Sequence, residues 1–301
     1  MIIYEYTNKM YIARQDLRQI RRIIVADYRE TVDYILGIPL FAQKIGKENL
    51  SSLLCRLGNP EKSIPAVHVA GTNGKGSTCR ALAQMLTGMG YRVGLFTSPH
   101  LVSINERIQI DGENISDADF VWAFETVKEK FTQHPSFFEV MFAMAAVYFR
   151  EKKCDFVVYE TGMGGRLDAT NVLMPELSII TSVGMDHMEY LGDTIEKIAA
   201  EKAGIIKPGI PMIYFKRDEA VAKVIEDTAR GQKSPVIPVE KQDYIINHLG
   251  DKTIDFSLHS RYYSYCNLVI QKTSLYQLEN ISLAVMAFYG LMKARNASEE
   301  D

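Results

Sequence analysis

The sequence predicts an α/β protein: a doubly wound, mostly parallel sheet with a phosphate-binding loop (P-loop), plus a small antiparallel β annex. Short apolar segments alternate with longer helix-like segments over most of the chain, which is typical of a parallel sheet with helices on both faces. Residues 155–160 are almost wholly apolar, so they are expected in the middle of that sheet, where both faces of a strand are buried. Beyond residue 235 the pattern changes to short alternating segments, which indicates the annex.

The strands are predicted from runs of apolar and β-branched residues that end at turn-forming residues. These runs cover residues 66–70, 91–96, 155–160, 177–182 and 210–215. Residues 105–110 alternate between polar and apolar side chains before a turn at Asp111 and Gly112, so they are predicted to form a further strand. The alternating segments of residues 235–271 are predicted to form the annex.

The helices are predicted from apolar residues spaced three and four positions apart and from the breakers that end such runs. The predicted helices cover residues 14–26, 28–36, 50–57, 75–89, 137–150, 195–202, 219–230 and 278–291. A further helix is expected after Ser116, a good N-cap that is followed by Asp117 and Asp119 in the first turn.

Composition and charge exclude several classes of function. The chain has 301 residues, of which 47% are hydrophobic and 24% charged, and its net charge is −3. These values give no electrostatic reason to expect nucleic acid or a membrane surface as a partner. The four cysteines lie far apart, as in reduced proteins, and no apolar run reaches the roughly 20 residues of a membrane-spanning helix. We expect a cytoplasmic protein. A monomer that binds small molecules is also expected.

A glycine-rich loop joins the first predicted strand to the first long helix. Its residues are Gly71, Thr72, Asn73, Gly74, Lys75, Gly76, Ser77 and Thr78. Glycines let backbone N–H groups approach an anion, the helix start adds partial positive charge, and Lys75 adds a full one. A hydroxyl in the loop can reach a magnesium ion. The alternative is a turn between two core elements, but this combination favours a loop that binds nucleotide phosphates.

The spacing within this loop differs from the usual phosphate loop. The common pattern has four residues between the first glycine and the Gly-Lys pair, and a hydroxyl residue directly after the lysine. Here two residues separate Gly71 from Gly74, and Gly76 precedes Ser77. The loop is therefore a variant of the pattern.

Polar residues follow the other predicted strands, at the sheet edge where ligands of parallel sheets bind. They are Ser98, Glu160, Asp186 with His187, and the residues after Phe215. Glu160 ends an apolar strand, where a carboxylate is poorly solvated unless a cation meets it. We predict that it is a magnesium ligand facing the phosphate loop; the alternative is a capping or salt-bridged glutamate. His187 is expected at the same edge in a metal or phosphate role, although a lone histidine is more often structural.

Three further features have either a role in the active site or a purely structural one. Residues 162–171 are dense in glycine and follow the central strand, so a substrate loop is favoured over a flexible surface turn. Lys202 shares one helix face with Ile195 and Ile198, so it is either an active-site lysine or one whose amine extends to solvent. His68 lies inside a predicted strand and is assigned to the core or to a supporting role.

Together these stretches resemble the folylpolyglutamate synthase and dihydrofolate synthase family, a branch of the Mur-type ATP-dependent amide ligases. The matching motifs lie at residues 57–60, 68–78, 97–101, 105–108, 160–171 and 181–209. Gln277 and Asn280 match the family's His-Gln-x-x-Asn element, with Tyr276 where histidine is commoner. The Gly-Lys-Gly-Ser form of the loop and the run Gly-Gly-Arg-Leu-Asp-Ala-Thr-Asn resemble the folate branch. The resemblance covers residues 36–295.

The resemblance implies ligands for ATP and for two magnesium ions. The loop from Gly71 to Thr78 would bind the phosphates, and Asn280 would contact the nucleotide. Ser98 and Glu160 would bind one Mg²⁺, and His187 a second.

The resemblance also implies which residues act on the substrate. The catalytic residues would be Lys75, His187 and Lys202. Lys202 matches a position that is carbamylated in the family, which would turn an inward-facing cation into an anion. The residues implied to contact the folate or dihydropteroate are Pro99, His100, Arg107, Arg166 and Asp168.

The reaction that the resemblance implies is ATP-dependent addition of L-glutamate to the carboxylate of a folate or dihydropteroate through an acyl phosphate. Two alternatives stay open: a Mur-type ligase acting on another carboxylate, and a non-catalytic nucleotide-binding module.

The resemblance to this family also predicts the domain organisation. We expect an N-terminal extension over residues 1–27, a Mur-type ATPase domain over residues 28–296 and the start of an interdomain linker over residues 297–301. The family's C-terminal glutamate-binding domain is expected to be absent, because neither its Pro-Gly-Arg element nor its Asp-Gly-x-x-Asn-Pro element occurs. The chain by itself is then expected to bind nucleotide and magnesium with little or no ligase turnover.

Overall fold

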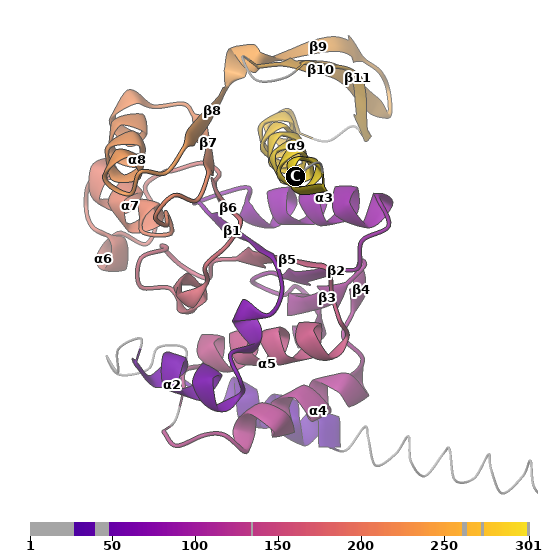
Figure 1. The fold of residues 1–301 in the computed structure, drawn as a ribbon, viewed down its shortest axis with the longest axis vertical. Helices are drawn as coiled ribbons and strands as arrows, with labels where there is room; N and C mark the ends of the chain where they lie inside the picture. The colour runs from indigo at the N-terminus through magenta and orange to yellow at the C-terminus, as the bar shows by residue number, and fades with distance from the viewer. Residues whose placement is uncertain (1–26, 40–47, 134, 261–263, 272–273, 300–301) are drawn as a thin grey trace, which may run out of the picture.

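The computed structural model describes residues 27–39, 48–133, 135–260, 264–271 and 274–299 (Figure 1). The helix predicted for residues 14–26, and nearly all of the expected N-terminal extension, lie outside the described residues. Residues 297–299, where the linker is expected to begin, continue the last helix.

An eight-stranded, mostly parallel sheet forms the centre of the fold, as the sequence predicts. Its strands are β1 Ala66–Ala70, β2 Val93–Phe96, β3 Ile108–Ile110, β4 Glu113–Asn114, β5 Phe156–Glu160, β6 Leu177–Ile180, β7 Met212–Lys216 and β8 Val236–Glu240. They lie in the order β4-β3-β2-β5-β1-β6-β7-β8. The strands from β2 to β8 in that order are parallel, and β3 and β4 form an antiparallel edge. Every residue of the central strands β1 and β5 is buried, which confirms the prediction for residues 155–160.

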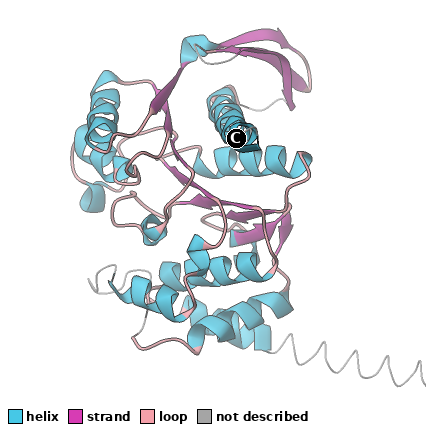
Figure 2. Cartoon of the chain, in the orientation of Figure 1, coloured by secondary structure: helices cyan, strands magenta, loops and turns pink. Residues whose placement is uncertain are grey.

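Helices cover both faces of the sheet (Figure 2). They are α2 Glu48–Arg56, α3 Lys75–Gly88, α4 Asp117–Lys128, α5 Phe137–Glu151, α6 Met188–Leu191, α7 Ile195–Ala203, α8 Glu219–Gly231 and α9 Gln277–Glu299, and residues 27–36 are also helical. On one face α3 packs against α9, and their apolar side chains share a core cluster with β1, β2, β5 and β6. The opposite face is covered by α5 beside β2 and β5, and by α7 and α8 beside β6 and β7.

Local sequence signals explain where the helices begin. The hydroxyl of Ser116 accepts a hydrogen bond from the Asp119 N–H, which confirms the predicted N-cap of α4. Ser136 and Glu139 form a capping box at the start of α5, so two backbone N–H groups gain partners there. The many apolar residues of α5 then bury almost the whole helix between the sheet and α4.

The predicted strand over residues 105–110 is wrong in its first half. Residues Ile104–Arg107 form a 3-10 helix, and the strand is confined to Ile108–Ile110. The cause is a second capping box, in which Ser103 and Glu106 bond each other's backbone N–H groups. This local bonding competes with strand pairing, although the polar and apolar alternation is typical of a strand.

The annex begins later in the chain than predicted. Residues 236–240 form β8, which pairs in parallel with β7 at the edge of the main sheet, where Pro238 is tolerated. The annex itself is a three-stranded antiparallel sheet of β9 Tyr244–Leu249, β10 Thr253–His259 and β11 Ser264–Gln271. Its middle strand packs Ile254 and Phe256 against Leu278 of α9, so the annex covers the outer side of that helix (Figure 1).

The parallel strands end at one common edge of the sheet. The loops after β1, β2, β5, β6 and β7 therefore meet there, and they carry most of the candidate site residues. Among the described helices, none is long and apolar enough to cross a membrane.

Candidate active site

The glycine-rich loop joins β1 to the N-terminus of α3, as the sequence predicts. Gly74 precedes the helix with φ of 85°, a left-handed conformation that favours glycine. The loop is bonded to the end of β6: Thr72 N donates to Ser182 O at 2.6 Å, and the hydroxyl of Thr181 donates to Asn73 O at 2.7 Å. This role of Thr181 and Ser182 was not predicted from the sequence; their position at the end of a predicted strand is the signal that could have indicated it.

The first turn of α9 lies against the same loop. Gln277 Nε2 donates to Ser77 Oγ at 3.3 Å, and Asn280 Nδ2 donates to Gln277 Oε1 at 2.8 Å. A Cβ at Gly74 would lie 2.1 Å from Asn280 Oδ1. Asn280, which the resemblance assigns to the nucleotide, thus lies beside the phosphate loop although it is far away in the sequence. Gln277 also contacts this loop, a contact that the motif match alone did not predict.

We expect Gly74→Ala to weaken nucleotide binding and to destabilise the chain by about 2 kcal/mol or more, since a left-handed residue acquires a Cβ that meets Asn280. Thermal unfolding and titration with a non-hydrolysable nucleotide analogue measure the two effects. The matched control is Gly88→Ala at the end of α3, where nothing lies within 4 Å of the added Cβ; it should leave nucleotide binding unchanged and, as a helical Gly→Ala change, lower stability not at all or raise it slightly. Equal behaviour of the two variants would contradict the close packing of Asn280 on the loop.

Lys75 and Glu160 face each other across the site. Lys75 Nζ donates to the carbonyl oxygens of Gly71 and Thr72 at 3.2 and 3.3 Å, and it lies 4.0 Å from Glu160 Oε1. Glu160 is 3% exposed at the end of β5. Burial raises the pKa of Glu160 to about 7, although the charge of Lys75 and the hydrogen bond from Ser98 N oppose the shift. One lysine at this distance therefore compensates the buried carboxylate incompletely.

The loop after β2 brings several predicted residues near Glu160. Arg107 Nε donates to His100 Nδ1 at 2.8 Å, and the guanidinium lies over the Phe137 ring at 5.1 Å. The charge of Arg107 opposes the rise in the pKa of Glu160. Ser98, Pro99, His100 and Arg107 thus belong to one loop that adjoins the carboxylate.

Glu106 shapes the tip of this loop. Its carboxylate accepts hydrogen bonds from the backbone N–H groups of Leu101, Val102 and Ser103 at 2.7 to 2.9 Å, and they lower the pKa of Glu106. The side chains of Leu101 and Val102 are 91% and 92% exposed. The loop therefore presents two apolar side chains to solvent at the carboxyl edge of the sheet. This role of Glu106 was not predicted from the sequence.

Arg166 and Asp168 are bonded to the protein itself. Arg166 pairs with Glu201 of α7 at 2.7 Å, and half of its side chain is exposed. Asp168 is buried and accepts hydrogen bonds from the N–H groups of Met163 and Thr170. The structure thus gives both residues a part in holding the loop after β5, and their predicted contact with substrate stays a prediction.

Lys202 lies inside the protein, not at its surface. The residue is 2% exposed, so the alternative in which its amine extends to solvent is wrong. Burial and the nearby charge of Lys75 lower the pKa of Lys202 to about 8, and the charge of Asp186 opposes this. Within the described residues no carboxylate forms an ion pair with Lys202.

His187 follows β6, at the predicted edge, but it does not join a group of ligands. It has a left-handed backbone with φ of 47° at the start of α6, and its Nε2 lies 3.6 Å from Asp186 Oδ2. Both side chains are substantially exposed. Among the described residues, no three or more His, Cys, Asp or Glu side chains are arranged to hold a metal ion. A magnesium ion that also binds phosphate needs only one or two protein carboxylates, so Glu160 and Ser98 fit such an ion.

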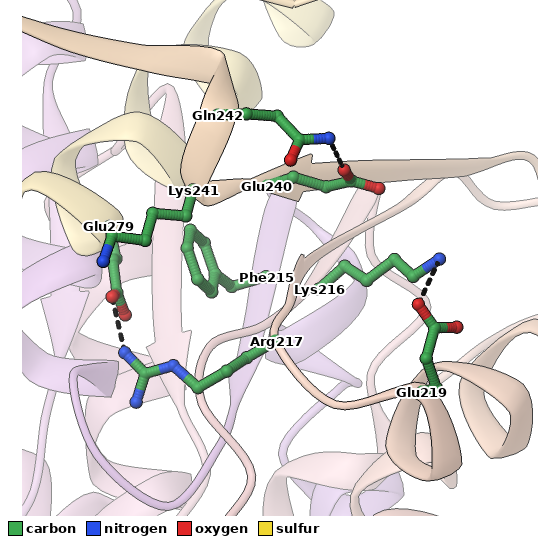
Figure 3. A pocket seen from close by; sticks show the side chains of 8 residues that line it. All are labelled: Phe215, Lys216, Arg217, Glu219, Glu240, Lys241, Gln242 and Glu279. Atoms are coloured by element: carbon green, nitrogen blue, oxygen red, sulfur yellow. Dashed lines mark hydrogen bonds and ion pairs between the residues drawn. The ribbon is translucent and has the colours of Figure 1, made fainter.

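The residues after Phe215 line an open groove at the carboxyl ends of β7 and β8, next to the first turn of α9 (Figure 3). Its volume is about 530 Å³. Arg217 forms an ion pair with Glu279, and Lys216 pairs with Glu219 at 3.1 Å. Glu279 precedes Asn280, so the groove adjoins the residue that lies beside the phosphate loop.

Comparison with known proteins agrees with this geometry. The model of the Mur ligase middle domain family matches residues 69–288. The dihydrofolate synthase/folylpolyglutamate synthase of Bacillus subtilis (strain 168) is 40% identical over 286 residues, which are 91% of this chain and 66% of that protein.

Solved structures give the same result. The crystal structure of folylpolyglutamate synthase from Thermotoga maritima has a TM-score of 0.79 and 38% identity, over 86% of this chain and 61% of that one. A structure of folylpolyglutamate synthase (FPGS), an FPGS–AMPPCP–folate complex, has a TM-score of 0.82 and 35% identity, over 87% of this chain and 66% of that one. This chain spans 66% or less of the length of these three proteins. It belongs to the Mur ligase middle-domain family, in its folylpolyglutamate synthase/dihydrofolate synthase branch.

Proposed function

We propose that this chain is the nucleotide-binding part of an ATP-dependent ligase that adds L-glutamate to the carboxylate of a folate or dihydropteroate. The observation that carries the proposal is the buried Glu160, which lies 4.0 Å from Lys75 Nζ beside a phosphate-type loop. A buried carboxylate is costly without a cation, and a nucleotide arrives with its metal ion. A similar chain is named a dihydrofolate synthase/folylpolyglutamate synthase, and another was solved with AMPPCP and folate.

The reaction follows from the charges at the site. The substrate carboxylate attacks the γ-phosphorus of ATP, giving an acyl phosphate and ADP. The amine of glutamate then attacks the acyl carbon, the C–O bond to phosphate breaks, and the amine loses a proton. Lys75 exchanges the carbonyl oxygens of Gly71 and Thr72 for phosphate oxygens and offsets their negative charge. The chain thus contributes positioning and electrostatic stabilisation.

Glu160 and the hydroxyl of Ser98 would hold a magnesium ion, which when bound offsets charge on the phosphates. We extend the proposal to a second magnesium ion, which His187 would hold and which would offset further phosphate charge. Carbamylation of Lys202 is also part of it: the amine nitrogen attacks carbon dioxide, loses a proton and leaves a carbamate. Because burial lowers the pKa of Lys202 to about 8, a fraction of roughly a tenth of the amine is neutral and reactive at pH 7.

The substrate is proposed to bind along the loop after β2, with Pro99, His100 and Arg107 nearest to the reacting carboxylate. Contacts from Arg166 and Asp168 complete the proposed set. The four cysteines of the chain are free, which supports a reducing compartment. The proposal also includes a cytoplasmic location and, as a separate expectation, action as a monomer.

The test combines binding and turnover. Calorimetry with Mg²⁺ and AMPPCP, and then with folate and dihydropteroate, measures the ligands of the chain as it stands. Turnover is measured as incorporation of labelled glutamate by a chimera in which this chain replaces the matching part of the Bacillus subtilis relative. We expect binding by the chain and turnover by the chimera that depends on both ATP and a pteridine substrate.

Each alternative predicts a different result. A ligase for another carboxylate would bind nucleotide but neither pteridine. A non-catalytic module would bind nucleotide and leave the chimera inactive although the chimera folds. Failure of the chain to bind nucleotide would contradict all three functions.

A further inference from the structure

A buried chain of hydrogen bonds runs from the middle of β1 to the loop after β5. His68 Nε2 lies 2.8 Å from Thr170 Oγ1, and Thr170 Oγ1 lies 2.5 Å from Asp168 Oδ1. His68 and Thr170 are fully buried, and Asp168 is 8% exposed. Of these three residues only Asp168 belongs to the function proposed above, as a substrate contact; the hydrogen bonds that link the three residues take no part in the proposed reaction.

The donors and acceptors in this chain can be assigned. Asp168 already accepts hydrogen bonds from the N–H groups of Met163 and Thr170, so it also accepts the single hydrogen of the Thr170 hydroxyl. That hydroxyl oxygen can then only accept from His68, which places the imidazole hydrogen on Nε2. Full burial lowers the pKa of His68 to about 3, so the ring stays neutral. Its Nδ1 has no hydrogen-bond partner among the described residues.

The loop that this chain holds is packed directly on the last turn of α7. Arg166 N donates to Glu201 O at 2.7 Å, and Asn171 Nδ2 donates to Gly204 O at 3.0 Å. A Cβ at Gly165 would lie 2.8 Å from Glu201 O and 2.9 Å from Lys202 O. The backbone of the loop therefore fixes the position of the helical turn that carries Lys202.

β1 connects this arrangement to the phosphate loop. The strand carries His68 in its centre, and the loop with Lys75 begins directly after its last residue. Lys75 and Lys202 lie close enough for the charge of the first to affect the second. The two lysines come from elements far apart in the sequence, so a rigid link between the elements is needed to keep their separation constant.

We propose that His68 is a positioning residue, which acts through Thr170 and Asp168 to fix the loop of residues 162–171 and, through it, Lys202 relative to the phosphate loop. The expected effect of His68 on turnover rests on the proposed function, whereas the anchoring of the loop of residues 162–171 does not. His68 itself touches neither nucleotide nor substrate in this assignment. The role differs from simple core packing because it depends on one hydroxyl and one ring nitrogen.

The test uses Thr170→Val, which keeps the shape of the side chain and removes the hydroxyl, and Thr170→Ser, which keeps the hydroxyl. Thr161→Val is the matched control, since the Thr161 hydroxyl is also fully buried but has no hydrogen-bond partner among the described residues. Amide hydrogen exchange is measured by NMR at Arg166 and Gly204, and at amides of α3 and α8 for comparison. The dissociation constant of Mg²⁺ and AMPPCP is measured in the chain, and kcat and KM in the chimera.

We expect Thr170→Val to raise exchange about tenfold or more at Arg166 and Gly204 but not in α3 or α8. It should lower kcat about tenfold or more, because a small misplacement of a reacting group is costly, while the nucleotide dissociation constant changes less than threefold. Thr170→Ser and Thr161→Val should behave like the unchanged protein. If Thr170→Val does not fold, the pair His68→Gln, which keeps a donor, and His68→Leu, which removes it, is compared in the same way.

Two exchange results would overturn the proposal, and so would one binding result. The exchange results are unchanged exchange at Arg166 and Gly204, or exchange raised equally throughout the chain. A nucleotide affinity that falls together with kcat would also overturn it, because the phosphate loop would then be affected directly. If the unaltered chimera has no turnover, the proposed function fails, while the exchange and binding measurements still decide whether His68 anchors the loop.

Discussion

Replacing Lys75 with alanine is expected to weaken the binding of Mg²⁺ and AMPPCP by about 10- to 100-fold, because each hydrogen bond to a charged group contributes about 1.5–3 kcal/mol. In the structure the Lys75 ammonium makes hydrogen bonds to two carbonyl oxygens of its own loop and lies 4.0 Å from Glu160. We expect Lys75 to exchange these contacts for phosphate oxygens when nucleotide binds. Nucleotide-dependent turnover by the chimera should be nearly abolished, since Lys75 also offsets charge on the transferring phosphoryl group.

Calorimetry measures the affinity, and thermal unfolding shows whether the variant stays folded. Lys62→Ala is the control: this side chain is 63% exposed and lies before β1, away from the phosphate loop, so its loss should change neither binding nor turnover. A Lys75→Ala protein that binds nucleotide as tightly as the unchanged chain, or a chimera that stays active with ATP, would refute the assignment of this loop to phosphate.

The sequence predicted the parts of the fold that depend on local pattern. The strands at residues 66–70 and 155–160 agree with β1 and β5 to within one residue, because each is a short apolar run bounded by clear turns. The N-cap at Ser116 was also correct, since a cap is defined by three or four neighbouring residues. The 3-10 helix at Ile104–Arg107 was missed, although its capping box is local too: the alternation of polar and apolar residues was given more weight than Ser103 and Glu106.

Features that depend on distant residues were less predictable. Residues 236–240 were placed in the annex, because nothing in their own pattern shows that they pair with β7. The hydrogen bonds of the phosphate loop to Ser182 and Gln277 join segments more than a hundred residues apart. From the sequence, Lys202 could be either a buried active-site lysine or one whose amine extends to solvent. Its helix position indicated the inward face but not whether the amine reaches solvent, and the structure shows that the residue is buried.

We expect Lys202→Met to stabilise the chain at pH 7, by up to about 3 kcal/mol. The substitution removes a buried cation, and the methionine side chain that replaces it has a similar length. Burial lowers the pKa of Lys202 from 10.5 to about 8 in the folded protein. The same substitution should abolish turnover by the chimera if the amine or its carbamate takes part in the reaction. A gain in stability with a loss of activity is the pattern expected of a strained functional group.

The pH dependence gives a second test of the same residue. Below pH 8 both the folded and the unfolded chain carry a proton on Lys202, so the full cost of burying the charge is present. Between about pH 8 and pH 10.5 the folded chain loses the proton while the unfolded chain keeps it, so Lys202 destabilises the fold less as the pH rises. The difference in unfolding free energy between Lys202→Met and the unchanged chain should therefore be at its full value at pH 7 and below, and should become small as the pH passes 10.5.

Chemical denaturation in buffer free of carbon dioxide measures this difference without carbamylation. Lys197→Met on the same helix is the control, because this lysine is 62% exposed and paired with Asp193, so its removal should change stability little at any pH in this range. A Lys202→Met protein that is less stable than the unchanged chain at pH 7 would show that the ammonium has a favourable partner when folded. Bicarbonate gives a separate measurement. Its addition should stabilise the unchanged chain but not Lys202→Met, since a carbamate at Lys202 replaces the buried cation beside Lys75 with an anion.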